Sequence, residues 1–306
     1  MKKSILLTGS AGHLGRHIAA ALQTAGFRVV DFDLAAPVPA DVRDRNAVLH
    51  AVARVDGVIH LAAVSRVARA ESDPELCYAT NVLGTKNVVD AALCSPTRPW
   101  ILFVSSREVL GSTQLIEIAT ETSARAPCNV YGQTKAEAEQ IVHHASAAGL
   151  TAAIIRLSNV YGSPTDLPER AIPSFVRSAL AGRDLQVRGP ERLFDFLHVD
   201  DAIHGLMLLV DRMDHGRTVP GLVHLVSGQS FALGEIAKQV VQLSESTSRI
   251  HRVPAVTNDV AGFRGSHALA TECLGWRPTI DVKTGLCRLI DITRGLPQPQ
   301  ARMAAV

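Results

Sequence analysis

Several kinds of segment are missing from the sequence. It has no apolar run near the roughly 20 residues that a membrane span needs. The apolar stretch near the N-terminus is too short for a signal peptide. There is no run of basic residues, and the formal net charge is only +2, so neither nucleic acid nor an anionic membrane is expected as a partner. These absences predict a cytoplasmic protein that acts on a small molecule.

Metal-binding and disulfide patterns are also absent. The chain has five cysteines but no Cys-x-x-Cys pair, and twelve histidines but no His-Glu-x-x-His motif. Scattered cysteines in a chain without a secretion signal are typical of reduced thiols. The sequence therefore predicts neither a metal site nor a disulfide framework.

Short strand patterns alternate with longer helical patterns through the first half. Strands are expected at 4–9, 28–33, 56–63, 100–106 and 152–162, and helices at 13–26, 81–94 and 130–148. Apolar strands that alternate with helices indicate an α/β fold whose parallel sheet is covered on both faces. We expect a first domain over 1–162 and a smaller lobe mainly over 163–294, with segments near 185–228 partly returning to the first domain. The tail at 295–306 has no periodic pattern and is expected to be flexible.

The stretch TGSAGHLG places Gly9, Gly12 and Gly15 between the first strand and the first helix. Glycines at this spacing permit a tight turn, close approach of a pyrophosphate, and close packing of helix on strand. Asp33 ends the second strand, where a carboxylate accepts hydrogen bonds from ribose hydroxyls and repels a 2′-phosphate. Asp31 points to the other side of the strand. The motif and its acid predict a dinucleotide site that prefers NAD to NADP.

A second cluster carries the chemistry. Tyr131 and Lys135 lie four residues apart on one helix and so share a face. A lysine ammonium favours the phenolate, which can take a proton from a secondary alcohol as hydride leaves for NAD. Ser106 ends a predicted strand, where its hydroxyl can hold the substrate oxygen against Tyr131. Taken alone, a Tyr-x-x-x-Lys pair is usually just a surface pair, and Ser106 by itself is better explained as a turn residue at the end of a strand.

Together these motifs resemble the extended short-chain dehydrogenase/reductases, in particular the NAD-dependent epimerase/dehydratase family. The resemblance covers almost the whole chain. It rests on TGSAGHLG, Asp33, DVRD (41–44), HLAA (60–63), TNVLGTKNVV (80–89), VSSREVLG (104–111), YGQTK (131–135), RLSNVYG (156–162), HVDD (198–201) and LGWRP (274–278). It implies a Rossmann-like, doubly wound parallel sheet with a smaller C-terminal α/β substrate-binding lobe. It also implies a Ser–Tyr–Lys triad and a homodimer formed through helices at about 81–95 and 130–148.

The resemblance assigns further residues. The expected NAD-binding set is Gly9, Ala11, Gly12, His13, Leu14, Gly15, Asp33, Asp41, Val42, Leu61, Ala62, Ala63, Asn81, Tyr131 and Lys135. The expected substrate-binding set is Ser65, Ser106, Arg107, Glu108, Asn159, Arg192 and Phe194.

Two positions depart from the family pattern. Members that use nucleotide sugars commonly carry an arginine for the substrate diphosphate where this chain has Phe194. In the register set by Asp259, Val256 replaces a second such arginine. A phenyl ring cannot replace a guanidinium at a phosphate. Compensation by Arg192, Arg252 or Arg264 stays open, as does a substrate without a nucleotide diphosphate.

The pair after Ser106 is also unusual. Family 4,6-dehydratases place an acid there that protonates the leaving hydroxyl, whereas this chain has Arg107 followed by Glu108. An arginine is no general acid at neutral pH, so sugar dehydration is disfavoured. Arg107 has two open interpretations: it holds a substrate carboxylate, or it pairs with Glu121 or another exposed acid.

Three functions stay open. The first is an NAD-dependent epimerase that oxidises a secondary alcohol of a sugar, as in nucleotide-sugar epimerases, and returns the hydride to the other face. The second is a net dehydrogenase or reductase of a small non-nucleotide hydroxy compound. The third is a regulator that senses NAD without turnover, which the presence of both Tyr131 and Lys135 disfavours.

Overall fold

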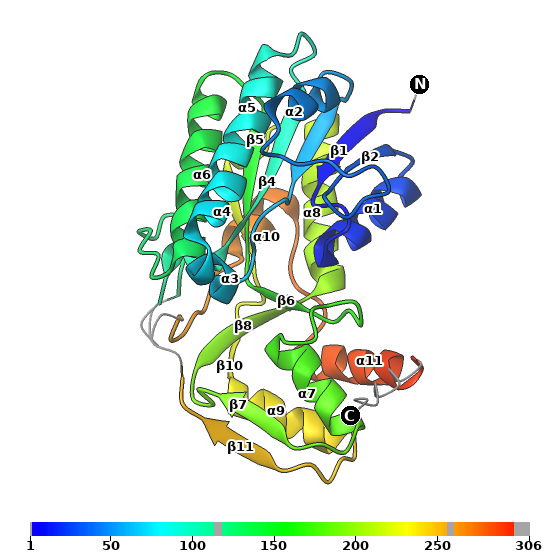
Figure 1. Cartoon of the computed structure of the whole chain (residues 1–306), viewed down its shortest axis with the longest axis vertical. Helices are drawn as coiled ribbons and strands as arrows, with labels where there is room; N and C mark the ends of the chain where they lie inside the picture. Colours follow the sequence, from blue (N-terminus) through cyan, green and yellow to red (C-terminus); the bar gives the residue numbers. More distant parts are fainter. Residues whose placement is uncertain (1, 113–117, 256–259, 297–306) are drawn as a thin grey trace, which may run out of the picture.

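A six-stranded parallel sheet forms the core of the larger part of the molecule (Figure 1). The computed structural model describes residues 2–112, 118–255 and 260–296. The strand order is β2-β1-β3-β4-β5-β9. These strands are β1 (Ser4–Thr8), β2 (Arg28–Phe32), β3 (Gly57–His60), β4 (Trp100–Ser106), β5 (Ala152–Leu157) and β9 (Leu222–Leu225). The predicted α/β class and parallel sheet are confirmed.

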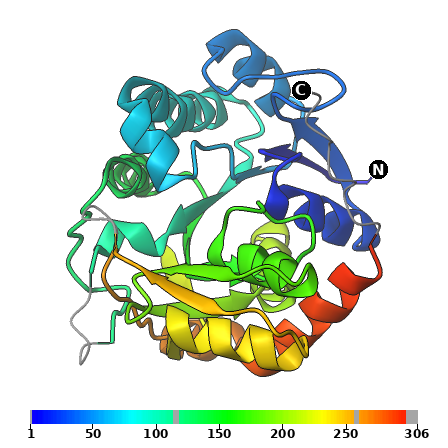
Figure 2. The ribbon, with the colours of Figure 1, turned by 60° about the horizontal axis from the view of Figure 1, so that its bottom comes forward.

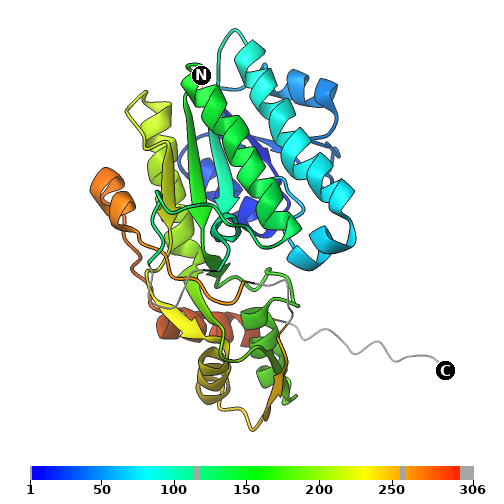
Figure 3. The same cartoon turned by 90° about the vertical axis from the view of Figure 1, so that its left-hand side faces the viewer.

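Helices cover both faces of the sheet because its strands are apolar on both sides. One layer contains α1 (His13–Thr24), α8 (Val199–Asp214) and α10 (Ala268–Leu274), and the other contains α2 (Arg45–Val52), α5 (Gly84–Cys94) and α6 (Val130–Ala147). Neighbouring strand residues alternate between the two cores: Leu7 packs in the first and Leu6 in the second. Figure 3 shows the two helical layers on opposite sides of the sheet. The sheet is therefore doubly wound, as predicted.

A smaller lobe lies beyond the carboxyl end of the sheet (Figure 2). It contains a three-stranded sheet, β10-β8-β6, and a two-stranded sheet, β11-β7. Its elements are β6 (Asn159–Tyr161), α7 (Ala171–Leu180), β7 (Leu185–Arg188), β8 (Leu193–His198), β10 (Ser230–Ala232), α9 (Leu233–Leu243), β11 (Ile250–Val253) and α11 (Val282–Arg294). A separate apolar core that includes Phe175, Leu185 and Ile236 holds this lobe together.

The chain crosses between the two parts more than once. After β8, helix α8 packs on α1 and β9 becomes the edge strand of the central sheet. Strands β7 and β8 stay in the smaller lobe. The division at residue 162 remains a prediction, and of the predicted flexible tail only residues 295–296 lie inside the described range. Within that range, no helix combines the length and apolar character needed to cross a membrane.

The strand order reverses between β1 and β3. From β1 the chain moves outward to β2 and then returns past β1 to β3. In open α/β sheets, such a switch point leaves a crevice at the carboxyl ends of the two strands, where ligands bind. The loops that follow β1 and β3 therefore border the expected dinucleotide site.

Candidate functional site

The glycine-rich loop after β1 is shaped by close backbone contacts. Gly9 has a φ of +73°, a conformation that favours glycine. A Cβ atom at Gly15 would lie 2.1 Å from the Gly9 carbonyl oxygen, so α1 can pack against the loop only with glycine there. The Thr8 hydroxyl accepts hydrogen bonds from the backbone N–H groups of Leu61 and Ala62, both at 3.1 Å. The loops after β1 and β3 are thus fixed to each other.

Asp33 lies beside the glycine-rich loop, one residue after β2. Its carboxylate accepts hydrogen bonds from the backbone N–H of Ala11 at 3.1 Å and of Ala35 at 2.8 Å. Asp31 is exposed. The tight glycine-rich turn, the N-terminus of α1 and a carboxylate just after β2 are the parts that a dinucleotide requires, so the residues present fit NAD.

Two of the expected cofactor residues are engaged elsewhere. The Asp41 carboxylate forms an ion pair with Arg43, and this guanidinium holds the pKa of Asp41 below its usual range. The Val42 side chain is buried against Gly84 at the start of α5. Contact of Asp41 and Val42 with an adenine remains a prediction.

Asn81 is buried and ties three segments together. Its Oδ1 accepts a hydrogen bond from the backbone N–H of Val64 at 2.8 Å, and its Nδ2 donates to the Thr134 hydroxyl at 3.0 Å. It lies in a π-helical turn, Ala79–Leu83, between α4 (Pro74–Tyr78) and α5. Such turns are frequent at functional sites. Asn81 therefore positions the loop after β3 against α6. No feature of the sequence indicated the π turn.

Tyr131 is buried on the first turn of α6. Asn129 caps this helix by accepting a hydrogen bond from the backbone N–H of Gly132 at 2.8 Å. Burial raises the pKa of Tyr131 to about 12, and a hydrogen bond with the Ser106 hydroxyl opposes this effect only in part. The structure thus brings together Ser106 at the end of β4 and Tyr131, as expected.

Lys135 lies one turn further along α6 and is also buried. Its ammonium donates a hydrogen bond to the Val104 carbonyl oxygen at 2.7 Å and lies 4.4 Å from the centre of the Phe103 ring. Burial lowers the pKa of Lys135 to about 8, against the attraction of Glu139. The lysine is therefore anchored to β4, the strand that ends at Ser106.

A buried ion pair that the sequence did not suggest fixes α6 to the sheet. Arg156 on β5 donates to both carboxylate oxygens of Glu139, at 2.8 and 2.7 Å. Ser105 donates to the same carboxylate at 2.7 Å. Because Glu139 follows Lys135 by one turn, this anchor sets the position of the helix face that carries Tyr131 and Lys135.

Arg107 and Glu108 form a buried pair in the turn η2 (Arg107–Leu110). Arg107 Nη2 lies 2.8 Å from Glu108 Oε1, and Asn129 donates to Glu108 Oε2 at 2.8 Å. The suggested pairing of Arg107 with Glu121 or another exposed acid is wrong: Glu121 instead accepts from the backbone N–H of His224. The tight turn brings the side chains of these two consecutive residues together. Their adjacency in the sequence did not by itself indicate that they pair.

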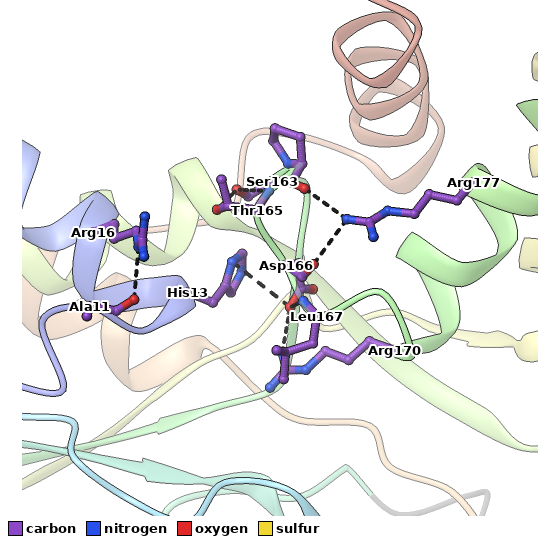
Figure 4. A network of polar contacts seen from close by, with 10 residues as sticks. Ala11, His13, Arg16, Ser163, Thr165, Asp166, Leu167, Arg170 and Arg177 are labelled. Carbon is purple, nitrogen blue, oxygen red and sulfur yellow. Dashed lines mark hydrogen bonds and ion pairs between the residues drawn. The ribbon is translucent and has the colours of Figure 1, made fainter. Parts of the chain in front are cut away.

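His13 connects the glycine-rich loop to the loop that follows β6 (Figure 4). Its Nδ1 lies 4.0 Å from the buried Asp166 carboxylate, which is 3.6 Å from Arg170 Nη1. In the same loop Glu169 pairs with Arg66, which follows β3. The loop from Ser163 to Arg170 therefore contacts the segments after both β1 and β3, across the switch point.

The remaining expected residues are spread more widely. Asn159 contacts Arg107, Leu14 and Ala63 are half-buried, and Ser65 is exposed. Of the arginines considered as replacements, Arg252 pairs with Glu191 and Arg264 donates to the Gly228 carbonyl oxygen, and both are exposed. Val256 and Asp259 lie outside the described residues.

Two motifs shared with the family are structural in this chain. Asp201 of HVDD accepts hydrogen bonds from Thr279 and Ile280, and its backbone oxygen accepts from the Trp276 indole of LGWRP. The two motifs join α8 to the segment between α10 and α11.

The fold and the site define a dinucleotide-binding α/β enzyme. The model of the NAD dependent epimerase/dehydratase family matches residues 5–220. The UDP-N-acetyl-alpha-D-glucosaminuronate decarboxylase of Bacillus cytotoxicus is 29% identical over 282 residues, covering 83% of this chain and 84% of that protein. UDP-glucuronate 4-epimerase 1 of Arabidopsis thaliana is 26% identical over 325 residues, covering 94% and 76% respectively. The NAD complex of a Thermus thermophilus UDP-glucose 4-epimerase has the same fold, with a TM-score of 0.86, 24% identity, and coverage of 95% of this chain and 99% of that one.

The chain belongs to the NAD-dependent epimerase/dehydratase family, as its motifs predicted. It is an NAD-dependent enzyme, and its relatives include sugar-nucleotide epimerases and decarboxylases.

Proposed function

We propose that this enzyme changes the configuration of a secondary alcohol on a nucleotide-linked sugar, without net oxidation. The observation that carries the proposal is the hydrogen bond between Tyr131 and Ser106. Lys135 lies one turn further along the same helix, and Ser106 ends β4, the neighbour of β3 at the switch point of the sheet. The names of the relatives, which act on UDP-linked sugars, support the substrate class.

Each residue has a defined role in this proposal. NAD supplies the acceptor that takes a hydride from the alcohol carbon and later returns it. Ser106 holds the reacting oxygen against Tyr131, and Tyr131 takes the alcohol proton and gives it back to the ketone. The glycine-rich loop and Asp33 hold the dinucleotide. Lys135 holds the nicotinamide ribose and contributes positive charge near the phenol.

The pKa values of Tyr131 and Lys135 support a catalytic phenolate that forms only when the oxidised cofactor is bound. A tyrosine with a pKa of about 12 is neutral at pH 7. The phenolate therefore needs added positive charge, which the oxidised nicotinamide ring brings. Lys135, with a pKa of about 8, is mainly protonated at neutral pH and adds to this charge. Proton removal is thus coupled to the presence of the oxidised cofactor.

Dehydration does not suit this site. A carboxylate that removes a C–H proton needs an oxygen free to approach the substrate. Both oxygens of Glu108 are engaged, one by Arg107 and the other by Asn129. The site therefore favours hydride transfer over elimination of water.

Phe194 favours a second candidate, a net dehydrogenase or reductase of a small non-nucleotide hydroxy compound. Its ring is buried on β8, where it brings no cation to a diphosphate. The two candidates differ in the fate of the cofactor, which is unchanged after epimerisation and reduced or oxidised after a net reaction.

A product analysis tests the proposal. NAD-loaded protein is incubated with UDP-glucose, UDP-glucuronate and dTDP-glucose, and the sugars are identified by NMR while NADH absorbance is followed. We expect an epimer of one sugar without accumulation of NADH, and loss of this activity by roughly a hundredfold or more in Tyr131→Phe with NAD binding retained. Net NADH formation would favour the second candidate, and unchanged turnover in Tyr131→Phe would overturn the assigned roles.

The homodimer also stays a proposal. Tyr78 and Leu83 are exposed apolar side chains beside α5, where the expected contact lies. Sedimentation of wild type and of Leu83→Glu tests it: a dimer that becomes a monomer on substitution is the expected result.

A further inference from the structure

Arg107 is a buried cation at the junction of the two lobes. It directly follows Ser106 at the end of β4 and is only 5% exposed. Its guanidinium lies 5.0 Å from the centre of the Phe194 ring, on β8 of the smaller lobe. The ring of Phe263 lies 5.7 Å away. The two aromatic rings therefore hold the guanidinium next to the residue that meets the reacting oxygen.

Two of its three nitrogens have partners. Nε donates to Asn159 Oδ1 at 3.3 Å, and Nη2 pairs with Glu108 at 2.8 Å. Nη1 is buried without a hydrogen-bond partner among the described residues. A buried charged donor that lacks a partner is unfavourable, because it has lost its hydrogen bonds to water without replacement. An oxygen atom from a ligand would remove this cost.

Glu108 does not provide an acceptor for Arg107 Nη1. One of its carboxylate oxygens pairs with Arg107 Nη2, and the other accepts a hydrogen bond from Asn129. Arg107 Nη1 is therefore left as a charged donor that can bind an anionic oxygen.

We propose that Arg107 binds a carboxylate on the sugar ring, so that the substrate is an acidic sugar of the uronic acid type. The inference rests on the proposed function. A carboxylate on the ring carbon next to the reacting alcohol has its carbon only two bonds from the reacting carbon. A diphosphate on the anomeric carbon lies across the ring from that alcohol. Because Arg107 adjoins Ser106, the nearer group is the one it meets.

A pair of ligands that differ only in this group tests the inference. NAD-loaded protein is titrated by calorimetry with UDP, UDP-glucose and UDP-glucuronate. We expect wild type to bind UDP-glucuronate more tightly than UDP-glucose by roughly tenfold or more, as for one charge-assisted hydrogen bond. Arg107→Met keeps a long apolar side chain between the two rings and should abolish that preference, with UDP-glucose binding nearly unchanged.

Two further variants separate recognition from folding. The double variant Arg107→Met/Glu108→Gln removes both charges of the pair and should likewise lose the preference for the acid sugar. Arg252→Met, which removes an exposed arginine of the smaller lobe, should keep it.

The outcomes are distinct. Equal binding of the two sugars by wild type overturns the carboxylate assignment and leaves the proposed function standing. An equal loss of UDP, UDP-glucose and UDP-glucuronate in Arg107→Met also overturns it, since the arginine then serves the shared diphosphate or the fold. Binding of none of the three ligands by wild type overturns both the inference and the nucleotide-sugar function.

Discussion

His13 Nδ1 lies 4.0 Å from the Asp166 carboxylate, and this contact joins the glycine-rich loop to the loop that enters the smaller lobe. His13 stands at the first position of α1, and Asp166 follows β6. Both side chains are largely removed from water, and the neighbouring Arg170 and His17 add to the lowering of the pKa of His13. The position of the smaller lobe is therefore coupled to the glycine-rich loop.

This contact predicts a pH dependence of stability. Burial lowers the pKa of His13 from 6.5, although Asp166 opposes the shift. As pH falls below 6.5, the unfolded chain binds a proton that the folded chain resists, so stability decreases. We expect His13→Asn to flatten part of the decline in melting temperature on the acid side. An identical decline in wild type and variant contradicts this assignment, and His50→Asn, at an exposed site, serves as the control.

The tight packing at Gly15 makes a second prediction. Its added Cβ atom would meet the carbonyl oxygens of Gly9 and Ser10, neither of which is a flexible group. We expect Gly15→Ala to lower the free energy of unfolding by roughly 1–3 kcal/mol and to abolish NAD binding, measured by denaturation and calorimetry. Gly221→Ala is the matched control, because nothing lies within 4 Å of its Cβ position. NAD affinity equal to wild type in Gly15→Ala would show that the loop tolerates displacement.

The parts of the site that were predictable from sequence are local. The glycine spacing of TGSAGHLG, the acid after β2 and the four-residue spacing of Tyr131 and Lys135 each reflect one turn or one helix face. These features depend on backbone geometry within a short segment, so sequence order is sufficient to place them.

The parts that were not predictable depend on side chains from distant segments. Glu139 meets Arg156 across a helix and a strand, and Arg107 lies against Phe194 from the other lobe. Such contacts follow from tertiary packing, which residue spacing does not encode. The family pattern marks Phe194 as a lost arginine and favours a substrate without a nucleotide diphosphate, yet its ring faces a guanidinium from the turn after β4. The charge at the junction was therefore present in the sequence, but the acid named for it there, Glu121, is not its partner.

The anchor of α6 gives a third prediction. Glu139→Gln leaves Arg156 as a buried cation without its carboxylate, and removal of one partner from a buried pair costs about 3–5 kcal/mol. Glu137→Gln changes an exposed residue of the same helix and should have little effect. Urea denaturation of both variants measures the difference. Equal stability of the two variants would mean that Arg156 finds other acceptors.

Tyr131 gives the last prediction, through its ionisation. The chain has three tyrosines, so Tyr131 can be followed as the difference in tyrosinate absorbance between wild type and Tyr131→Phe. Because burial raises its pKa from 10.0 to about 12, the cofactor-free protein should show no signal from Tyr131 at pH 10, where an ordinary tyrosine is half ionised. The neutral phenol stabilises the fold below pH 10, and this contribution is lost as pH rises through about 12. Adding NAD brings a positive charge to the site and should shift the titration to lower pH, less so in Lys135→Met. A Tyr131 signal already complete at pH 10 without NAD would contradict the buried, neutral phenol on which the coupling of proton removal to cofactor depends.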